Sequence, residues 1–368
     1  MTRGEILVVN SGSATVKLSL FRRGEGGDWE ASVRGQIDGN GAAAMDAVAA
    51  WLQPHLEGEP LLAAGHRVVH GGSKYSRPVR LDREVLGELK EFIPLVPLHQ
   101  PYNLAVIETL LERMPDLPQV ACFDTAFHRG RALVTEILPL PWEFYESGVR
   151  RYAFHGLSYE YVASVLPQVA PEIASGRVVV AHLGSGASLA AMHNLKCADS
   201  TLSFTALDGM CMGTRPGAID PGVILYLFQS RGLSVGEVDR ILYKESGLKG
   251  ISGISNDMRD LLASREPRAQ LAIEYFIYRV AKEIGAMAAV LGGLDGLVFT
   301  AGIGENAPEI RRRICASCAW LGLVLDEEAN ARGEARISAA ASRVAAWVIP
   351  TNEELMIARH TAAVLGLG

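Results

Sequence analysis

The feature that most constrains the fold is a pair of similar segments that lie roughly 170 residues apart. Residues 6–21 read ILVVNSGSATVKLSLF, and residues 178–192 read VVVAHLGSGASLAAM. Each segment has an apolar strand, a polar residue, a Gly/Ser turn and a second strand, which is the pattern of a β-hairpin. Similar hairpins that open two parts of one chain predict a duplicated architecture. A chance match between two Gly/Ser turns is the alternative.

Short β-branched strands alternate with helical stretches along the rest of the chain, which favours α/β layers over an all-α or all-β fold. A length of 368 residues fits two domains of ordinary size. We expect strands at Glu5–Val9, Lys17–Phe21, Gln119–Phe123, Arg177–His182, Gly296–Thr300 and Ala345–Ile349, and helices at Asn103–Arg113, Leu271–Leu291 and Glu353–Leu365.

Composition makes several classes of protein poor candidates. The formal charge is −6, from 41 acidic and 35 basic residues, and the basic residues are scattered, so nucleic acid is not an expected partner. Met1–Asn10 shows no signal peptide, and the longest apolar stretch, near Ile284–Leu294, is too short to span a bilayer. We therefore expect no membrane association. The five cysteines fit a cytoplasmic location.

Cys315 and Cys318 form a CxxC pair inside a predicted helix. Such a pair is either a redox or zinc motif, or two small residues on one helix face. We favour the second interpretation because no further cysteine pair or histidine lies nearby in the sequence.

Three glycine-bearing turns could bind phosphate or a nucleotide. The turns at residues 10–13 and 184–188 can present several backbone N–H groups to one anion. The third turn contains Gly302, Gly304 and Ala307, between a strand and a helix that Pro308 opens. It is either a dinucleotide fingerprint, with Asp326 placed for a ribose, or a contact to adenosine. We favour adenosine because little α/β sequence follows the turn.

Several charged residues are interpreted as lying at strand ends, and such positions converge in open α/β sheets. Arg67, Asp124, His155, His182 and Arg215 are of this kind, although each alone could be a surface or capping residue.

The final predicted helix is preceded by Thr351, which with Glu354 fits a capping box. That assignment leaves Glu353 either as a metal ligand or as a complement to the helix dipole.

Ten segments, in order and over essentially the whole chain, resemble the acetate kinase family, which includes acetate and propionate kinases. They include HRVVHGG, FDTAFH, RRYAFHGLS, HLGSGAS, DGMCMGTRPGAIDP and FTAGIGENA. The resemblance implies a duplicated α/β fold related to actin, Hsp70 and the sugar kinases. It further implies an N-terminal domain of residues 1–125 with 355–368, a C-terminal domain of residues 126–354 that makes most nucleotide contacts, and a cleft between them. A homodimer is also implied.

The family resemblance implies that the enzyme phosphorylates acetate reversibly with ATP and Mg²⁺, Mn²⁺ being an alternative ion. His155 would donate to the phosphoryl group in flight, and Arg67 and Arg215 would hold the two anions. The implied metal ligands are Asn10, Asp124 and Glu353. The implied nucleotide residues are Asn10, Ser11, Gly12, Ser13, Lys17, His182, Gly184, Ser185, Gly186, Gly302, Gly304 and Asn306. The implied acyl pocket is Val69, Leu98, Phe154 and Ala206.

The expected chemistry needs no general base, because a carboxylic acid with a pKa of about 4.3 is already ionised at neutral pH. Asp124 is therefore better suited to organise a metal, and we expect direct in-line transfer.

The chain also departs from the family pattern at Leu157, Tyr159, Ser185, Ala206 and Ala218. Ala206, in place of a usual proline, could enlarge the acyl pocket, so propionate or butyrate is the alternative substrate. An ATP-binding protein without turnover and an NAD-binding enzyme are more distant alternatives.

Overall fold

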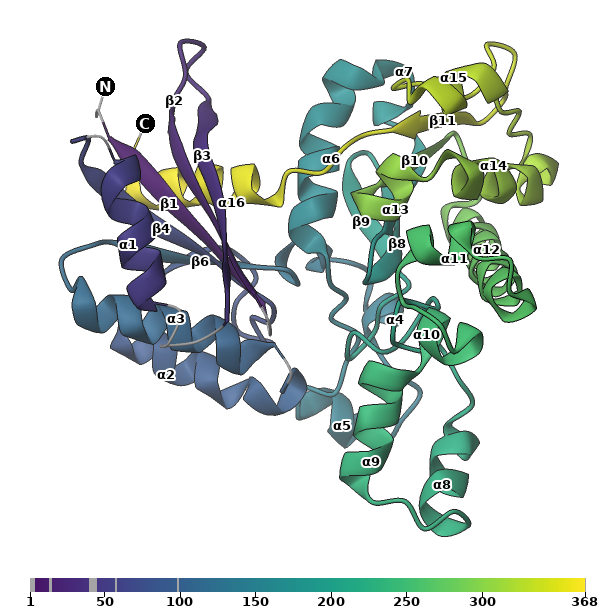
Figure 1. Cartoon of the computed structure of the whole chain (residues 1–368), viewed down its shortest axis with the longest axis horizontal. Helices are drawn as coiled ribbons and strands as arrows, with labels where there is room; N and C mark the ends of the chain where they lie inside the picture. Colours follow the sequence, from purple (N-terminus) through teal and green to yellow (C-terminus); the bar gives the residue numbers. More distant parts are fainter. Residues whose placement is uncertain (1–3, 13–14, 40–44, 57, 98, 368) are drawn as a thin grey trace. The chain divides into compact units, whose positions relative to one another are not determined.

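The structure, a computed structural model, describes residues 4–12, 15–39, 45–56, 58–97 and 99–367 (Figure 1). The chain forms two compact units. Unit 1 comprises Met1–Arg129, Phe154–Tyr161 and Asn352–Gly368, and unit 2 comprises Gly130–Ala153 and Val162–Thr351. Unit 1 includes the segment Phe154–Tyr161, which the expected N-terminal domain did not contain. The expected domain boundaries themselves stay a prediction.

Unit 1 contains a mixed sheet with the strand order β3-β2-β1-β4-β6-β5 among the described residues. Its strands are β1 (Glu5–Ser11), β2 (Thr15–Arg23), β3 (Trp29–Asp38), β4 (Leu61–Val68), β5 (Val79–Arg80) and β6 (Gln119–Phe123). Its helices are α1 (Met45–His55), α2 (Arg83–Glu91), η2 (Ile93–Leu95), α3 (Gln100–Arg113), η3 (Ala126–His128) and α16 (Glu353–Leu365). The hairpin β1–β2 is antiparallel, whereas β1, β4 and β6 run parallel.

Unit 2 contains a second mixed sheet, with the order β11-β10-β7-β8-β9. Its strands are β7 (Arg177–Leu183), β8 (Ala187–His193), β9 (Lys196–Ser200), β10 (Gly296–Thr300) and β11 (Ala345–Val348). Its helices are α4 (Leu133–Glu136), α5 (Trp142–Glu146), α7 (Pro171–Ala174), α8 (Pro221–Gln229), α9 (Val235–Arg240), η4 (Ile241–Glu245), α10 (Gly247–Ser252), α11 (Met258–Ala263), α12 (Pro267–Leu291), α13 (Ala301–Asn306), α14 (Pro308–Ser317), η5 (Ala319–Leu321) and α15 (Glu327–Arg332). Helix α6 (Gly156–Val169) begins in unit 1 and continues into unit 2.

The two sheets repeat one topology. The order β3-β2-β1-β4-β6 in unit 1 corresponds to β9-β8-β7-β10-β11 in unit 2. The strand directions agree as well, because each central strand is antiparallel to its hairpin partner and parallel to the strand on its other side. The duplicated α/β arrangement predicted from the two Gly/Ser hairpins is thus present.

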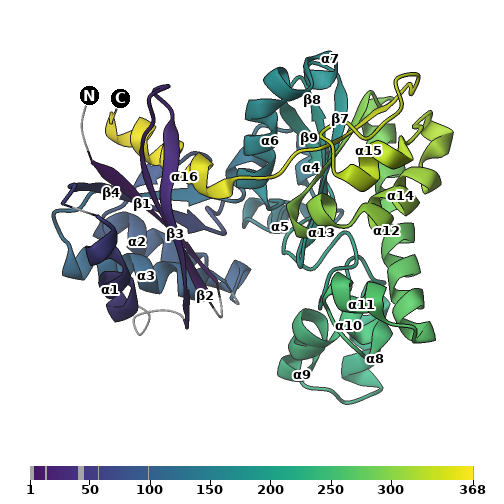
Figure 2. The same cartoon turned by 45° about the horizontal axis from the view of Figure 1, so that its top comes forward.

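Side chains of β1 alternate between the two faces of the first sheet, as a strand requires. Leu7 and Val9 lie in one apolar cluster with residues of α1 and α3, whereas Ile6 and Val8 lie in another cluster with residues of α16. Figure 2 shows α16 on one face and α1 with α3 on the other. Both faces are therefore buried, which explains the continuous apolar run of this strand.

Each expected strand and helix corresponds to an observed element, with shifted bounds in most cases. The predicted capping box at Thr351 and Glu354 is wrong. Asn352 is the N-cap of α16, and its Oδ1 accepts the Leu355 N–H at 3.1 Å. In the described ranges, no helix combines the length and the apolar character that crossing a membrane requires.

Candidate active site

Three of the predicted residues meet at one edge of the first sheet. Arg67 lies near the end of β4, Asp124 directly follows β6, and Asn10 lies near the end of β1. Nε of Arg67 is 3.0 Å from both carboxylate oxygens of Asp124, and its Nη1 donates to Asn10 Oδ1 at 3.3 Å. The three strands are parallel neighbours, so their carboxyl ends place these side chains together.

Glu353, the first residue of α16, adds a negative charge near this cluster. Desolvation of the Glu353 carboxyl group raises its pKa, and the charge of Arg67 lowers it. The charge of Asp124 raises the pKa as well, so the net shift is upward. Burial lowers the pKa of Arg67, but the charges of Asp124 and Glu353 outweigh that effect and raise it. Two neighbouring carboxylates in a desolvated site are stabilised by a cation.

The donor set fits Mg²⁺, which favours oxygen ligands and is commonly bound through one or two carboxylates plus phosphate. Asp124, Glu353 and the amide oxygen of Asn10 supply such oxygens. No group of three or more His, Cys, Asp or Glu side chains arranged as a metal site occurs in the described part of the chain, so nucleotide phosphate or water would have to complete the coordination.

His155 is held in a left-handed backbone conformation, with φ at +58°, directly before α6. This conformation is unusual for a residue with a side chain, and such residues cluster at functional sites. The next residue, Gly156, donates its N–H to the carbonyl oxygen of Asp124 at 2.8 Å. A Cβ atom on Gly156 would lie 2.2 Å from that oxygen, so only glycine allows this approach. His155 directly precedes Gly156, so the hydrogen bond from Gly156 to Asp124 fixes the backbone next to His155.

The described members of the expected acyl pocket are divided between the units. Val69 and Phe154 are buried in unit 1, where the Phe154 ring lies edge-on to the His70 ring with centroids 5.7 Å apart. Ala206 belongs to unit 2. Leu98, like Ser13 of the first Gly/Ser turn, lies outside the described residues.

Two residues that sequence analysis did not assign to the site, Gln100 and Asn103, hold its backbone. Asn103 Oδ1 accepts the Val69 N–H at 3.1 Å, and its Nδ2 donates to the Ser11 carbonyl at 2.5 Å. Gln100 Nε2 donates to the His70 carbonyl at 2.9 Å. Both side chains are buried, and residues three apart share one helix face. In the sequence, two amide residues three positions apart in a predicted helix indicate that both side chains share one face, but they do not identify the backbone groups that they bind.

The other residues expected near nucleotide in unit 1 are less involved in this cluster. Ser11 is buried at the end of β1, and its hydroxyl donates to the Tyr102 carbonyl at 3.3 Å. Gly12 follows in the turn, and Lys17 is exposed on β2 opposite Asn10.

Unit 2 contains a pocket of about 480 Å³ between the second Gly/Ser turn and α13. Gly184, Ser185, Gly302 and Asn306 all line it, together with Asn256 and neighbouring residues of α11. Its volume falls in the range of small-molecule sites, roughly 300–1,000 Å³. The structure therefore brings the second Gly/Ser turn and the segment predicted as a third turn together around one cavity. The prediction of a turn over Gly302 and Gly304 is wrong, because both residues lie in the helix α13.

Gly186, Gly304 and His182 lie close to residues that line this pocket. Gly186 accepts the Gly184 N–H through its carbonyl oxygen at 3.1 Å. The Gly304 carbonyl accepts from Nη1 of the buried Arg311 at 2.9 Å, and His182 is buried in β7. These three residues are absent from the pocket lining.

The dinucleotide interpretation of the third turn loses its ribose residue. Asp326 caps α15, with its Oδ1 accepting the Ala329 N–H at 3.0 Å. A capping role accounts for this aspartate without a ribose, so it no longer supports the dinucleotide interpretation, and the adenosine contact stays a prediction.

Arg215 lies half-buried in unit 2, and its Nη1 donates to the Ala206 carbonyl at 2.8 Å. Burial lowers the pKa of Arg215 to about 10. Among the described residues, no carboxylate forms an ion pair with it. A desolvated guanidinium group without a paired anion is suited to bind one from a substrate.

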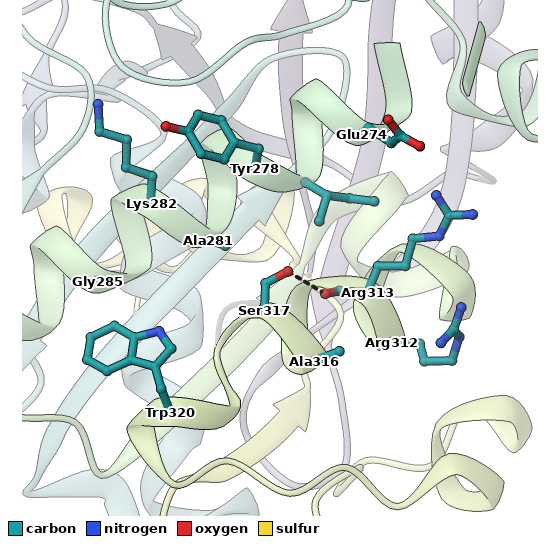
Figure 3. Close-up of a pocket in the computed structure, with 11 residues that line it drawn as sticks. Glu274, Tyr278, Ala281, Lys282, Gly285, Arg312, Arg313, Ala316, Ser317 and Trp320 are labelled. Carbon is teal, nitrogen blue, oxygen red and sulfur yellow. Dashed lines mark hydrogen bonds between the residues drawn. The ribbon is translucent and has the colours of Figure 1, made fainter. Parts of the chain in front are cut away.

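A second pocket in unit 2, of about 600 Å³, lies between α12 and the segment formed by α14 and η5 (Figure 3). Tyr278 and Trp320 line it, as do Arg312 and Arg313, which both pair with Glu309. None of the expected site residues borders this pocket, so it is separate from the candidate site.

Cys315 and Cys318 are both buried at the end of α14. Burial raises the pKa of each thiol, that of Cys318 to about 12. A reactive cysteine needs a lowered pKa, so the pair fits the interpretation as two small buried residues.

Comparison with known proteins identifies the family. The sequence matches the Acetokinase family over residues 38–359. It is 51% identical to the acetate kinase of Nitrobacter hamburgensis over 388 aligned residues, covering 98% of this chain and 96% of the relative. It is 50% identical to the acetate kinase of Rhizobium meliloti, with 98% of each chain covered.

Solved structures agree with this assignment. The propionate kinase of Francisella tularensis has a TM-score of 0.89 at 36% identity, covering 97% of this chain and 98% of that one. The acetate kinase of Porphyromonas gingivalis has a TM-score of 0.87 at 34% identity, covering 98% and 100%. The fold and sequence define a member of a class of phosphotransferases that use a carboxyl group as acceptor. The chain belongs to the Acetokinase family. The resemblance, the fold class and the enzyme class expected from the sequence are thus confirmed.

Proposed function

We propose that the protein is a short-chain carboxylate kinase that transfers a phosphoryl group reversibly between ATP and acetate. The observation that carries this proposal is the cluster of Asn10, Arg67 and Asp124 in a chain half identical to proteins named acetate kinase. It combines an arginine suited to anions with oxygen ligands suited to a divalent cation.

The nucleotide would occupy the pocket of unit 2, with its adenosine against Gly302 and Asn306 and its phosphates at the turn of Gly184 and Ser185. Asn10, Asp124 and Glu353 would hold Mg²⁺ or Mn²⁺. The bound metal ion neutralises charge on the phosphates. The exposure of Ser185 at this turn supports a contact between its hydroxyl and a phosphate oxygen.

The main obstacle to the reaction is repulsion between an anionic carboxylate and an anionic phosphate. Arg67 and Arg215 would bind these anions, and His155 would donate a hydrogen bond to the transferring group. Phosphoryl transfer depends mainly on positioning and on charge stabilisation, so no side chain is needed as general base or as phosphate carrier. We therefore propose direct in-line transfer.

The acid itself is proposed to be acetate, with propionate or butyrate as the alternative. Ala206 leaves space where a proline is usual in the family pattern. A solved relative with 36% identity is named propionate kinase, which supports propionate as an alternative substrate. A homodimer and a cytoplasmic location, both expected from the sequence, belong to the same proposal.

The direct test traps the acyl phosphate with hydroxylamine after incubation with ATP and acetate, propionate or butyrate, with and without Mg²⁺. We expect metal-dependent hydroxamate formation, with acetate or propionate as the best acid. Binding of ATP without hydroxamate from any acid would instead indicate a nucleotide-binding protein without turnover. Binding of NAD in preference to ATP would favour the dinucleotide alternative.

A further inference from the structure

Glu305 accepts two backbone hydrogen bonds with a single carboxylate oxygen. Its Oε1 accepts the N–H of Ala301 at 2.7 Å and the N–H of Thr351 at 3.0 Å. The side chain is half-buried on α13. Glu305 is not among the site residues predicted from the sequence and has no role in the proposed reaction, although it lies on α13 between Gly304 and Asn306. Hydrogen bonds to a charged acceptor are stronger than those between neutral groups.

The first of these bonds holds the corner where β10 becomes α13. Ala301 has φ at +64°, a strained conformation for a residue with a side chain. Its Cβ atom lies 3.7 Å from the point where a Cβ on Gly184 would be. Ala301 thus lies between the Gly/Ser turn of the nucleotide pocket and Gly302, which lines the same pocket. A shift of this corner would move both sides of the pocket.

The second bond holds the segment that leads to the proposed metal ligand. Thr351 directly precedes Asn352, the N-cap of α16, and lies two residues before Glu353. The chain passes from unit 2 to unit 1 between Thr351 and Asn352. The Thr351 N–H is therefore an anchor point immediately before the carboxylate that is proposed to bind Mg²⁺.

We infer that Glu305 is a positioning residue that couples the nucleotide pocket to the metal carboxylate Glu353. Because one oxygen holds both N–H groups, the strand–helix corner at Ala301 and the chain at Thr351 keep a fixed separation. The inference rests on the proposed function for the roles of the pocket and of Glu353. Glu305 itself contacts neither substrate nor metal in this role.

The test compares Glu305→Ala with Glu305→Gln, whose amide oxygen can still accept both N–H groups. Glu305→Asp is the second disruptive variant, since its shorter side chain draws the carboxylate back while keeping the charge. Glu328→Ala is the matched control, because Glu328 is an exposed glutamate on α15 that pairs only with Arg332 among the described residues. For each protein, calorimetry gives the Kd of ADP with and without Mg²⁺, and hydroxamate assays give the Mg²⁺ dependence of the rate.

We expect Glu305→Ala and Glu305→Asp to raise both the Kd of ADP and the half-saturating Mg²⁺ concentration, each by about tenfold, as for the loss of one charge-assisted hydrogen bond. Glu305→Gln should restore most of both values, and Glu328→Ala should match the unmodified protein. Thermal unfolding shows whether each variant is folded. A purely structural role would lower the unfolding temperature and leave ADP and Mg²⁺ binding by the folded protein unchanged, which would overturn the inference.

Two further outcomes would contradict the coupling. One is a change in ADP affinity with an unaltered Mg²⁺ dependence, and the other is a failure of Glu305→Gln to restore either value. If Glu305→Ala does not fold, Glu305→Asp decides between the same outcomes. Absence of hydroxamate from the unmodified protein would refute the proposed function alone, because the Kd of ADP with and without Mg²⁺ is still measured by calorimetry in every variant.

Discussion

Arg67 contacts both carboxylate oxygens of Asp124, with Nε 3.0 Å from each and Nη2 2.5 Å from Oδ2. The pair is built from the ends of two parallel strands, β4 and β6. The arginine is partly exposed, as contact with a substrate requires, whereas the aspartate is buried and holds the arginine in place.

Arg67→Lys should lower kcat by about 100-fold, because lysine keeps the charge but loses the forked geometry that binds carboxylate and phosphate. Steady-state rates with ATP and acetate measure the change. Arg359→Lys is the control, since Arg359 forms a comparable pair with Asp28 in the same unit, at 3.1 Å from Nε to Oδ1. Equal losses in the two variants would argue against a specific role for Arg67.

Arg215→Met should separate activity from stability. Removing a desolvated charge that has no carboxylate partner among the described residues should leave the free energy of unfolding unchanged or raise it by about 1 kcal/mol. The same change should lower kcat/KM for the acid by at least about 100-fold, through loss of an anion contact. Urea unfolding and rates at varied acetate concentration test both parts. A large loss of stability would show that Arg215 is structural, and Arg231→Met, at an exposed position, is the control.

His66 should make unfolding dependent on pH. It is buried in β4, where Nε2 lies 2.8 Å from Gln119 Oε1, and burial lowers its pKa from 6.5 to about 4. The neutral ring is favoured in the folded state, so its contribution is complete above pH 6.5 and is lost as the pH falls towards 4. The loss should reach about 3 kcal/mol, at about 1.4 kcal/mol per unit.

The measurement compares urea unfolding of the unmodified protein and His66→Leu between pH 6.5 and 5. The variant should show a weaker decline in the free energy of unfolding over this range. His193→Leu, at an exposed histidine, is the control substitution. Parallel slopes for the unmodified protein and His66→Leu would contradict the assigned cause.

Ala206→Pro should shift substrate preference towards acetate. The Ala206 carbonyl accepts from Arg215, so bulk added at this residue lies near a proposed anion-binding group. One methylene group in a pocket changes discrimination by about 1–3 kcal/mol. The ratio of kcat/KM for propionate to that for acetate should therefore fall by about tenfold in the variant. An unchanged ratio would place the specificity elsewhere in the pocket.

Several strands with strong apolar patterns were predicted well, but others were missed. β4 was not predicted, although most of its residues are buried. β6 and β10 have their predicted bounds, because each is a short run of buried residues. β3 was not predicted, since most of its residues are at least partly exposed and its apolar alternation is weak. At α16, Thr351 and Asn352 are both good capping residues, and the sequence does not decide which of two neighbours accepts the first N–H.

The charged residues of the candidate site could be predicted from the sequence, but the residues that hold its backbone in place could not. Arg67 lies near the end of β4 and Asp124 directly follows β6, so their meeting could be inferred from the rule for parallel sheets. Asn103 and Glu305 act by accepting backbone N–H groups from distant segments. Such bonds depend on tertiary approach, and a lone amide or carboxylate in a helix gives no sign of its partner.

The chain passes from one unit to the other more than once, so each unit is formed from separate sequence segments. α16 comes from the end of the chain, yet Ile357 and Ala358 lie in the apolar core of unit 1. A Cβ on Gly65 of β4 would lie 2.3 Å from Thr361 Oγ1, so this helix approaches the bare backbone of the sheet. The first unit therefore cannot acquire this helix until the ribosome has synthesised the chain through α16, and shorter nascent fragments would expose the apolar face that the helix covers.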